Sequence, residues 1–348
     1  MSVVYEGPGE LGMKFVAQMD RLTLEKIGEE GLANAARNQA VMHRGKSIAE
    51  LRGGPVGEGD SAIVIAAGPS IPRRNPIEAI KASGYKGALV ATDSAMYYML
   101  RNGVIPDLVV TVDPQEGLVR WFGQPDLDHE EIAKDDYWRR QDMDFAFADE
   151  LKTNREIMSL LETYGPQIKI ALATCASKSL VDRVLDIGMQ IYWWNPMFDD
   201  PDLPGSKTAA LFEANGMPCI NAGGNVGSSC YMIAHAVLEK KHVALTGIDF
   251  SYYPETPYFN TQYYRDLIDI IGEENLDSAY IRVFNPDLQK EFYTDPAYYW
   301  FRETFLELAA DADCVTYNCT EGGILFGDHI RTQPLSQFLT DMKASGAR

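Results

Sequence analysis

The sequence predicts an α/β protein built on a mostly parallel, doubly wound sheet. Short runs of aliphatic and β-branched residues recur along the chain, turn residues bound each run, and amphipathic segments of helical period separate the runs. Continuous apolar runs are typical of parallel strands that are buried on both faces, and the segments between them suit crossover helices. Helices are therefore expected on both faces of the sheet.

The runs expected to form strands are residues 62–67, 88–92, 108–113, 168–173, 191–194, 243–246 and 315–318. The segments 151–164, 178–187 and 230–240 have the apolar spacing of helices. We therefore assign residues 1–58 to a helical N-terminal extension, 59–330 to the sheet domain and 331–348 to a C-terminal helix. Insertions at about 115–150 and 251–295 are interpreted as lids, and a loop anchored by its aromatic residues is the alternative for the second.

Composition restricts the partners of the chain. Its 348 residues include 50 acidic and 31 basic ones, a net charge of −19 that disfavours nucleic acids and anionic membranes as partners. No run approaches the roughly 18 apolar residues of a membrane span, and no leader pattern opens the chain, so a cytoplasmic location is expected. The 5 cysteines lack CxxC spacing, so we expect buried thiols and no metal site. The sequence leaves the oligomeric state open, a homo-oligomer included.

The strongest local pattern is the apolar run 63–67 followed by Gly68-Pro69-Ser70. A tight turn at the carboxyl end of a parallel strand exposes backbone N–H groups and a hydroxyl that can hold a phosphate. The dinucleotide pattern GxGxxG and the P-loop pattern are both missing from this turn. A phosphate turn of another kind is therefore predicted, and a plain strand-to-loop turn is the alternative.

Acidic residues follow two further predicted strands. Asp93 and Ser94 come after the run 88–92, and Asp113 ends the run 108–113. Carboxylates at strand ends face the ligand crevice of an open α/β sheet, where they can bind ribose hydroxyls or a base amino group. Each of them taken alone suits a helix cap equally well.

Glycine and small polar residues mark two more turns. Residues 221–229 include Gly223, Gly224, Asn225, Ser228 and Ser229 and lead into a predicted helix. The strand 243–246 then runs into Gly247 and Asp249. Helix N-termini and glycine turns favour anions, so both segments are predicted to bind the nucleotide, with a serine-capped loop as the alternative for the first.

These residues resemble the MptE-like domain family. The resemblance rests on Gly68-Pro69-Ser70, Asp93-Ser94, residues 103–107 with Asp113, and residues 247–250 and 318–323, and it extends over about 63–327. That family is similar to the archaeal 6-hydroxymethylpterin diphosphokinase and to motility-associated factors thought to glycosylate flagellin. It also looks related to the bacterial CMP-sialic acid sialyltransferases, which are metal-independent. The resemblance implies a Rossmann-like fold and a nucleotide-dependent transferase.

The likeness to sialyltransferases implies roles for single residues. The phosphate turn of those enzymes is matched by Gly68, Pro69 and Ser70, and their nucleotide-contacting asparagines are replaced by Asp93 and Asp113. Their nucleotide loop lies near Ser228 and Ser229. Their G-I-D-F motif is matched by Gly247 and Asp249. Ser251 stands where they have the Tyr that helps the phosphate leave, and no His between His242 and His329 matches their general base. Tyr252 and Tyr258 are therefore expected to supply the phenol that helps the phosphate leave, and Tyr253 is also close by. Glu321 is expected to act as a base or to bind an acceptor hydroxyl, and a helix-capping role is the alternative.

The expected function is a glycosyltransferase with a nucleotide-sugar donor of the CMP-nonulosonate type and a glycan, protein or small alcohol as acceptor. The nucleotide is then a co-substrate, and no tightly bound cofactor is expected. One alternative is a diphosphokinase that uses ATP with Mg²⁺ on a pterin-like alcohol, although residues 112–115 read Val-Asp-Pro-Gln where that branch has Asp-Leu-Asp-Gly. The other alternative is a nucleotide-binding module without turnover.

Overall fold

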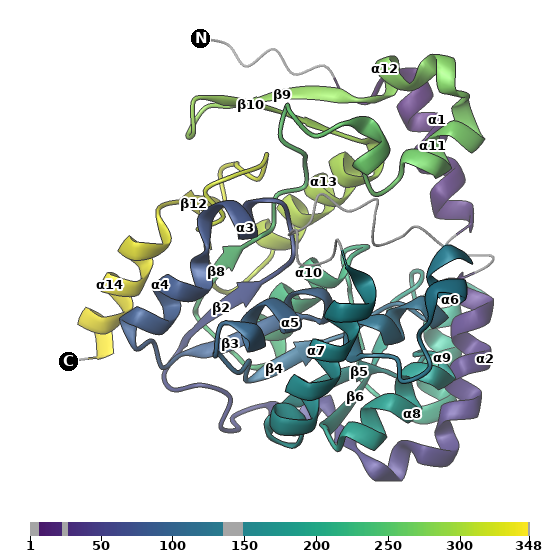
Figure 1. The fold of residues 1–348 in the computed structure, drawn as a ribbon, viewed down its shortest axis with the longest axis vertical. Helices are drawn as coiled ribbons and strands as arrows, with labels where there is room; N and C mark the ends of the chain where they lie inside the picture. Colours follow the sequence, from purple (N-terminus) through teal and green to yellow (C-terminus); the bar gives the residue numbers. More distant parts are fainter. Residues whose placement is uncertain (1–6, 23–26, 135–148, 347–348) are drawn as a thin grey trace.

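The computed structural model describes residues 7–22, 27–134 and 149–346. Its centre is one parallel sheet in the order β1-β6-β5-β4-β3-β2-β8-β11-β12, with β7 paired to the end of β6 (Figure 1). The strands are β1 (Lys46–Ser47), β2 (Ser61–Ile65), β3 (Ala88–Thr92), β4 (Leu108–Val110), β5 (Lys169–Ala173), β6 (Gln190–Pro196), β7 (Cys219–Ile220), β8 (His242–Thr246), β11 (Val315–Asn318) and β12 (Ile330–Thr332). The predicted mostly parallel α/β sheet is confirmed, and every predicted strand is present.

The strand order reverses beside β2. From β2 the chain runs outward through β3, β4, β5 and β6, and it then returns to the other side of β2 as β8. Val64 on β2 therefore lies opposite Val90 on β3 and Leu245 on β8, and all three side chains are buried. At such a reversal the chain leaves the two neighbouring strands in opposite directions, and open α/β sheets bind ligands outside the carboxyl ends of these strands.

Helices cover both faces of the sheet, because each face is apolar. One face packs against α4 (Pro76–Ser83), α5 (Asp93–Arg101), α7 (Glu150–Tyr164), α8 (Lys178–Ile187) and α14 (Leu335–Gly346). The other packs against α10 (Val226–Met232) and α13 (Pro296–Ala310). The helix predicted over 230–240 starts at Val226, and it continues after Met232 as a π-helical turn over Ile233–Val237.

Residues 264–294 are largely regular structure, within the insertion that the sequence assigned to a lid or an anchored loop. They contain α11 (Tyr264–Ile271), α12 (Leu276–Ala279) and an antiparallel hairpin of β9 (Ile281–Asn285) and β10 (Lys290–Thr294). Together with α1 (Gly9–Leu22) and α13 they form the upper part of the molecule in Figure 1. All tyrosines of this insertion except Tyr253 pack into a core of their own, which is the anchoring role that the sequence left as the alternative.

The ends of the chain and the first insertion also contribute to the fold. Within residues 1–58, α2 (Gly28–Asn38) packs against α8 and α9 (Lys207–Asn215), and β1 adds an edge strand in which Lys46 lies opposite Tyr192. The insertion at 115–150 begins with a 3-10 helix, η4 (Glu116–Phe122), and α6 (His129–Lys134). The remainder of that expected lid, residues 135–148, lies outside the described residues.

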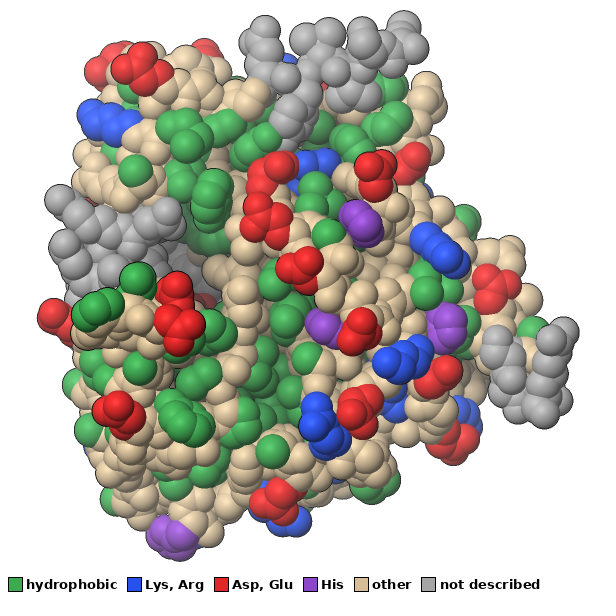
Figure 2. All heavy atoms as spheres, turned by 180° about the vertical axis from the view of Figure 1, so that it is seen from behind, with side chains coloured by type: hydrophobic (Ala, Val, Ile, Leu, Met, Phe, Trp, Pro, Cys, Tyr) green, Lys and Arg blue, Asp and Glu red, His purple; other side chains and the backbone are tan. Residues whose placement is uncertain are grey.

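The surface carries mixed charge. Figure 2 shows acidic and basic side chains interspersed over the right-hand half of the face opposite to Figure 1, with hydrophobic side chains gathered at its lower left and centre. All 5 cysteines are free thiols, and Cys175, Cys230 and Cys319 are buried. Among the described helices, none has the length and apolar character needed to cross a membrane.

Candidate functional site

Two turns meet at the carboxyl ends of β2 and β8, where the strand order reverses. The backbone pairing of the strands continues beyond them, because the amide of Ala66 donates to Thr246 (2.9 Å) and that of Gly68 donates to Gly247 (3.0 Å). The hydroxyl of Ser70 then donates to Oδ2 of Asp249 at 2.7 Å. The structure thus brings together the two turns that the sequence assigned to the nucleotide.

Glycine at 68 and 247 is required by the close approach of these turns. A Cβ atom at Gly68 would lie 2.2 Å from Oδ2 of Asp249 and 2.4 Å from the oxygen of Gly247. Gly247 has a φ of +70°, and a Cβ there would lie 2.3 Å from the oxygen of Ala66. The carboxylate of Asp249 and the backbone oxygen of Gly247 therefore occupy the space that a side chain at position 68 would need.

A third turn, after β11, packs against the same carboxylate. The amide of Ile324 donates to the backbone oxygen of Asp249 (2.9 Å), and a Cβ at Gly322 would lie 3.0 Å from Oδ1 of Asp249. Asp249 is 2% exposed, so it lies beneath the three turns rather than open to the crevice. In this position it orients Ser70. The part of Asp249 in nucleotide binding stays a prediction.

Glu321 has a structural role in the same turn. Its φ is +53°, its backbone oxygen accepts a hydrogen bond from Nε of Arg74 (3.0 Å), and Oε1 accepts one from the amide of Leu335 at the start of α14 (3.2 Å). The carboxylate thus caps a helix, which the sequence left as the alternative to a catalytic base.

Tyr253 lies at the edge of the three turns. A Cβ at Gly322 would be 2.7 Å from its hydroxyl, and the guanidinium of Arg73 lies over its ring at 4.0 Å from the centroid. Burial first and the charge of Asp249 second raise the pKa of Tyr253 to about 12, while Arg73 and Arg74 act in the opposite direction. The phenol is therefore a protonated hydrogen-bond donor at neutral pH, held between a buried carboxylate and two arginines.

Both arginines belong to α3 (Ser70–Arg74), the short helix that follows the Gly68-Pro69-Ser70 turn. Nη1 of Arg73 donates to the backbone oxygen of Pro69 at 2.7 Å, so the side chain folds back over the turn. Arg73 and Arg74 were not among the site residues predicted from the sequence. Two adjacent cations directly after a glycine turn, in an acidic chain, are the pattern that could have indicated them.

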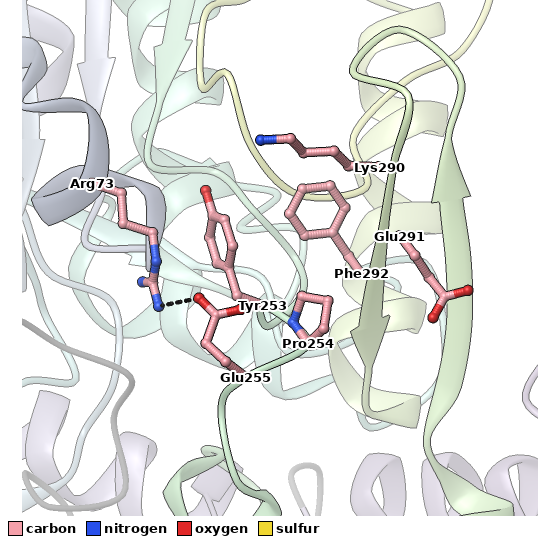
Figure 3. A pocket seen from close by; sticks show the side chains of 7 residues that line it. All are labelled: Arg73, Tyr253, Pro254, Glu255, Lys290, Glu291 and Phe292. Carbon is pink, nitrogen blue, oxygen red and sulfur yellow. Dashed lines mark hydrogen bonds and ion pairs between the residues drawn. The ribbon is translucent and has the colours of Figure 1, made fainter.

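A cavity of about 480 Å³ opens beside Tyr253. Figure 3 shows its wall, formed by Arg73, residues 253–255 and, from β10, Lys290, Glu291 and Phe292. The cavity thus lies between the end of α3 and the hairpin of the upper part. Its volume falls within the range of small-molecule sites.

Tyr252 and Tyr258 lie away from this cavity. Tyr252 is 3% exposed, and its hydroxyl donates to Oδ2 of Asp295 (3.0 Å) and accepts from the amide of Gln262 (2.9 Å). Tyr258 stacks on Tyr280 with 3.9 Å between ring centroids. Neighbouring residues of an extended segment point to opposite sides, which is why Tyr253 and not Tyr252 reaches the turns.

Asp93 and Asp113 form a second group at the ends of β3 and β4. The pKa of Asp93 is raised to about 7, mainly by burial and further by the charge of Asp113. The hydrogen bond from the amide of Ser94 (2.7 Å) lowers this pKa in part. Burial alone raises the pKa of Asp113 to about 6. Within the described residues, neither carboxylate is hydrogen-bonded to the Gly68-Pro69-Ser70 turn.

The glycine-rich segment before α10 is a packed helix start. Oδ1 of Asn225 caps the helix by accepting from the amide of Ser228 (2.9 Å), and the hydroxyl of Ser229 donates to the oxygen of Asn225 (3.0 Å). Ser228 and Ser229 are fully buried, and the predicted site residues Gly223 and Gly224 pack against Leu308 and Phe301 of α13. Asn225 rather than a serine is therefore the cap.

The same helix start lies close to the crevice. A Cβ at Gly227 would be 2.7 Å from Cδ1 of Ile248 and 3.8 Å from Cβ of Ala66, which are residues of the turns after β8 and β2. The described part of the chain contains no cluster of three or more His, Cys, Asp or Glu residues suited to a metal ion.

Comparison with known proteins supports the same fold. The structure of a MAf glycosyltransferase from Magnetospirillum magneticum AMB-1 superposes with a TM-score of 0.57 at 16% identity, over 95% of this chain and 44% of that one. The chain thus spans less than half the length of that protein. No curated protein matches it. Residues 33–128, which include Gly68-Pro69-Ser70, Asp93 and Asp113, match the family described as 6-hydroxymethylpterin diphosphokinase MptE-like, and the resemblance to the MptE-like family is confirmed.

Proposed function

We propose that this chain is a nucleotide-dependent transferase whose donor phosphate binds at the Gly68-Pro69-Ser70 turn. The observation that carries the proposal is the position of Tyr253 between the two arginines of α3 and the buried Asp249. In a chain with a net charge of −19, a pair of cations beside a turn at the strand-order reversal favours an anionic ligand there. Both names found in the comparisons, a diphosphokinase and a glycosyltransferase, are names of transferases.

The reaction favoured is glycosyl transfer from a nucleotide sugar of the CMP-nonulosonate type. The bond between the anomeric carbon and the phosphate oxygen breaks, and the electron pair stays on the phosphate. An acceptor hydroxyl bonds to the carbon and releases its proton to solvent. Negative charge develops on the leaving phosphate oxygen, where a protonated phenol and two guanidinium groups stabilise it. Tyr253 takes the part that the sequence gave to Tyr252 and Tyr258, and the acceptor is a glycan, a protein or a small alcohol.

Diphosphoryl transfer is the second candidate, and one observation favours it. Asp93 and Asp113 follow the neighbouring parallel strands β3 and β4, and carboxylate oxygens are the ligands that Mg²⁺ prefers. In this reaction the diphosphate of ATP moves to an alcohol such as 6-hydroxymethylpterin, AMP leaves, and Mg²⁺ is required.

A pair of turnover assays separates these reactions. The protein is incubated with CMP-N-acetylneuraminic acid, or with ATP and 6-hydroxymethylpterin, each with and without Mg²⁺, and the release of CMP or AMP is followed. We expect metal-independent release of CMP that exceeds the rate without protein. AMP release that depends on Mg²⁺ would instead establish the diphosphokinase, and binding of a nucleotide without any turnover would establish a binding module.

A further inference from the structure

The cavity beside Tyr253 has cationic and acidic residues in its wall, and they are not equally available. Glu255 pairs with Arg73 (3.4 Å), as the dashed line in Figure 3 shows, and Glu291 pairs with Arg282 (2.9 Å), which lies outside the cavity. Lys290 is exposed, and no ion pair joins it to another described residue. Both acids in the wall are therefore neutralised by arginines, and the ammonium group of Lys290 is available to a ligand.

The remaining wall is aromatic. Tyr253 and Phe292 meet edge to face with 5.2 Å between ring centroids, and Phe292 is 1% exposed. In Figure 3, Lys290 extends across the cavity from β10 towards the side on which Tyr253 and Arg73 lie. The cavity thus offers flat apolar faces beside a cation, which suits a ring that carries a negative charge.

We propose that this cavity binds the acceptor of the transfer reaction and that the acceptor is a ring compound with a carboxylate or phosphate group, which Lys290 recognises. The proposal rests on the proposed function, because it places the acceptor in the cavity that Tyr253 and Arg73 line beside the phosphate turn. Arg73 connects the two sites, since one nitrogen of its guanidinium reaches Pro69 in the phosphate turn and the other reaches Glu255 in the cavity wall. The cavity opens to solvent, so an acceptor can enter after the nucleotide has bound.

Three hexoses that differ in one group test the charge of the ligand. Glucuronic acid, glucose 6-phosphate and glucose are titrated into the full chain in the presence of CMP, and binding is measured by saturation-transfer NMR. We expect one or both anions to bind and glucose to bind at least about tenfold more weakly. The anion that binds identifies the carboxylate or the phosphate as the group recognised. Equal binding of all three hexoses, or of none, would overturn the proposal.

Two lysine variants test the residue. K290Q is expected to weaken binding of the anion by about fivefold, the loss typical of one partly exposed ion pair. K343Q, at an exposed lysine on α14, removes the same charge elsewhere and is expected to bind the anion like the unmodified chain. Unchanged anion affinity in K290Q would overturn the proposal. The affinity for CMP is measured in parallel. If the anion binds through Lys290 but the chain does not bind CMP, the cavity assignment stands and the proposed function is refuted.

Discussion

The hydroxyl of Ser70 donates a 2.7 Å hydrogen bond to the carboxylate of Asp249, so a buried contact joins the turn after β2 to the turn after β8. The two residues are 179 positions apart in the sequence, and both are at most 2% exposed. The bond therefore fixes how the two turns of the proposed phosphate site lie against each other, without itself contacting the ligand.

Replacement of Ser70 tests this bond. S70A is expected to lower the free energy of unfolding by about 2 kcal/mol, since it leaves a buried carboxylate with one donor fewer. S83A serves as the control, because its hydroxyl donates to Ile80 at the end of a surface helix. Urea denaturation of both variants measures the difference, and equal stability of the two would show that the bond contributes nothing to the fold.

Removal of the Tyr253 hydroxyl is expected to lower the rate of the transfer reaction and to leave the nucleotide affinity unchanged. Y253F keeps the ring under Arg73 but loses the donor to the leaving phosphate, so we expect kcat to fall by about 100-fold with an unchanged melting temperature and nucleotide affinity. Y258F, a phenol stacked on Tyr280, is the matched control and is expected to turn over normally. A Y253F protein with full activity would remove this phenol from the mechanism.

The Tyr252 hydroxyl is expected to affect stability and not nucleotide binding. Y252F removes one partner from the buried carboxylate of Asp295 and one from the amide of Gln262, and we expect a loss of about 1–3 kcal/mol in the free energy of unfolding. Calorimetry with the nucleotide should give the affinity of the unmodified chain. If stability stays the same and turnover falls, Tyr252 has the catalytic role that the sequence assigned to it.

The buried carboxylate of Asp93 predicts a dependence of stability on pH. Its pKa is about 7 in the folded chain against 3.8 for the free side chain, so the folded state holds a proton that the unfolded state releases in this interval. The stability associated with Asp93 is therefore fully present below about pH 4 and is lost as the pH rises through about 7.

Urea denaturation at about pH 4.5 and pH 7.5 checks this dependence. We expect D93N to lose less stability than the unmodified chain between the two pH values, because its amide does not ionise, while D182N at an exposed helix position should leave the dependence unchanged. Parallel pH curves for D93N and the unmodified chain would contradict the buried, raised pKa of Asp93.

The buried half of the fold could be predicted from the sequence because parallel strands are continuous apolar runs. Residues 88–92 and 315–318 were predicted with the bounds that the structure has. The hairpin of β9 and β10 could not be predicted in the same way. It is half exposed, and its turn depends on Asn285, whose Oδ1 accepts from the amides of Asp287 and Leu288.

Much less of the candidate site could be predicted. Gly68, Ser70, Gly247 and Asp249 could be predicted to lie together, because turns at the ends of parallel strands meet at one edge of the sheet. Which of these side chains lies beneath another depends on tertiary packing. The choice among neighbouring tyrosines had the same limit, because it depends on the direction of one extended segment. Glu321 and Asn225 have capping roles that depend on helix starts whose positions the sequence did not specify to the residue.

The proposed phosphate site is tested most directly by the affinity for a nucleotide after the two arginines beside the phosphate turn are removed. CMP and ATP are titrated calorimetrically, with and without Mg²⁺, into the unmodified chain, into the double variant R73A/R74A, and into R155A, which removes an exposed arginine from α7. We expect CMP to bind without Mg²⁺, R73A/R74A to bind it at least about tenfold more weakly, and R155A to bind it normally. Undiminished nucleotide affinity in R73A/R74A, or binding of no nucleotide by the unmodified chain, would contradict the proposed phosphate site.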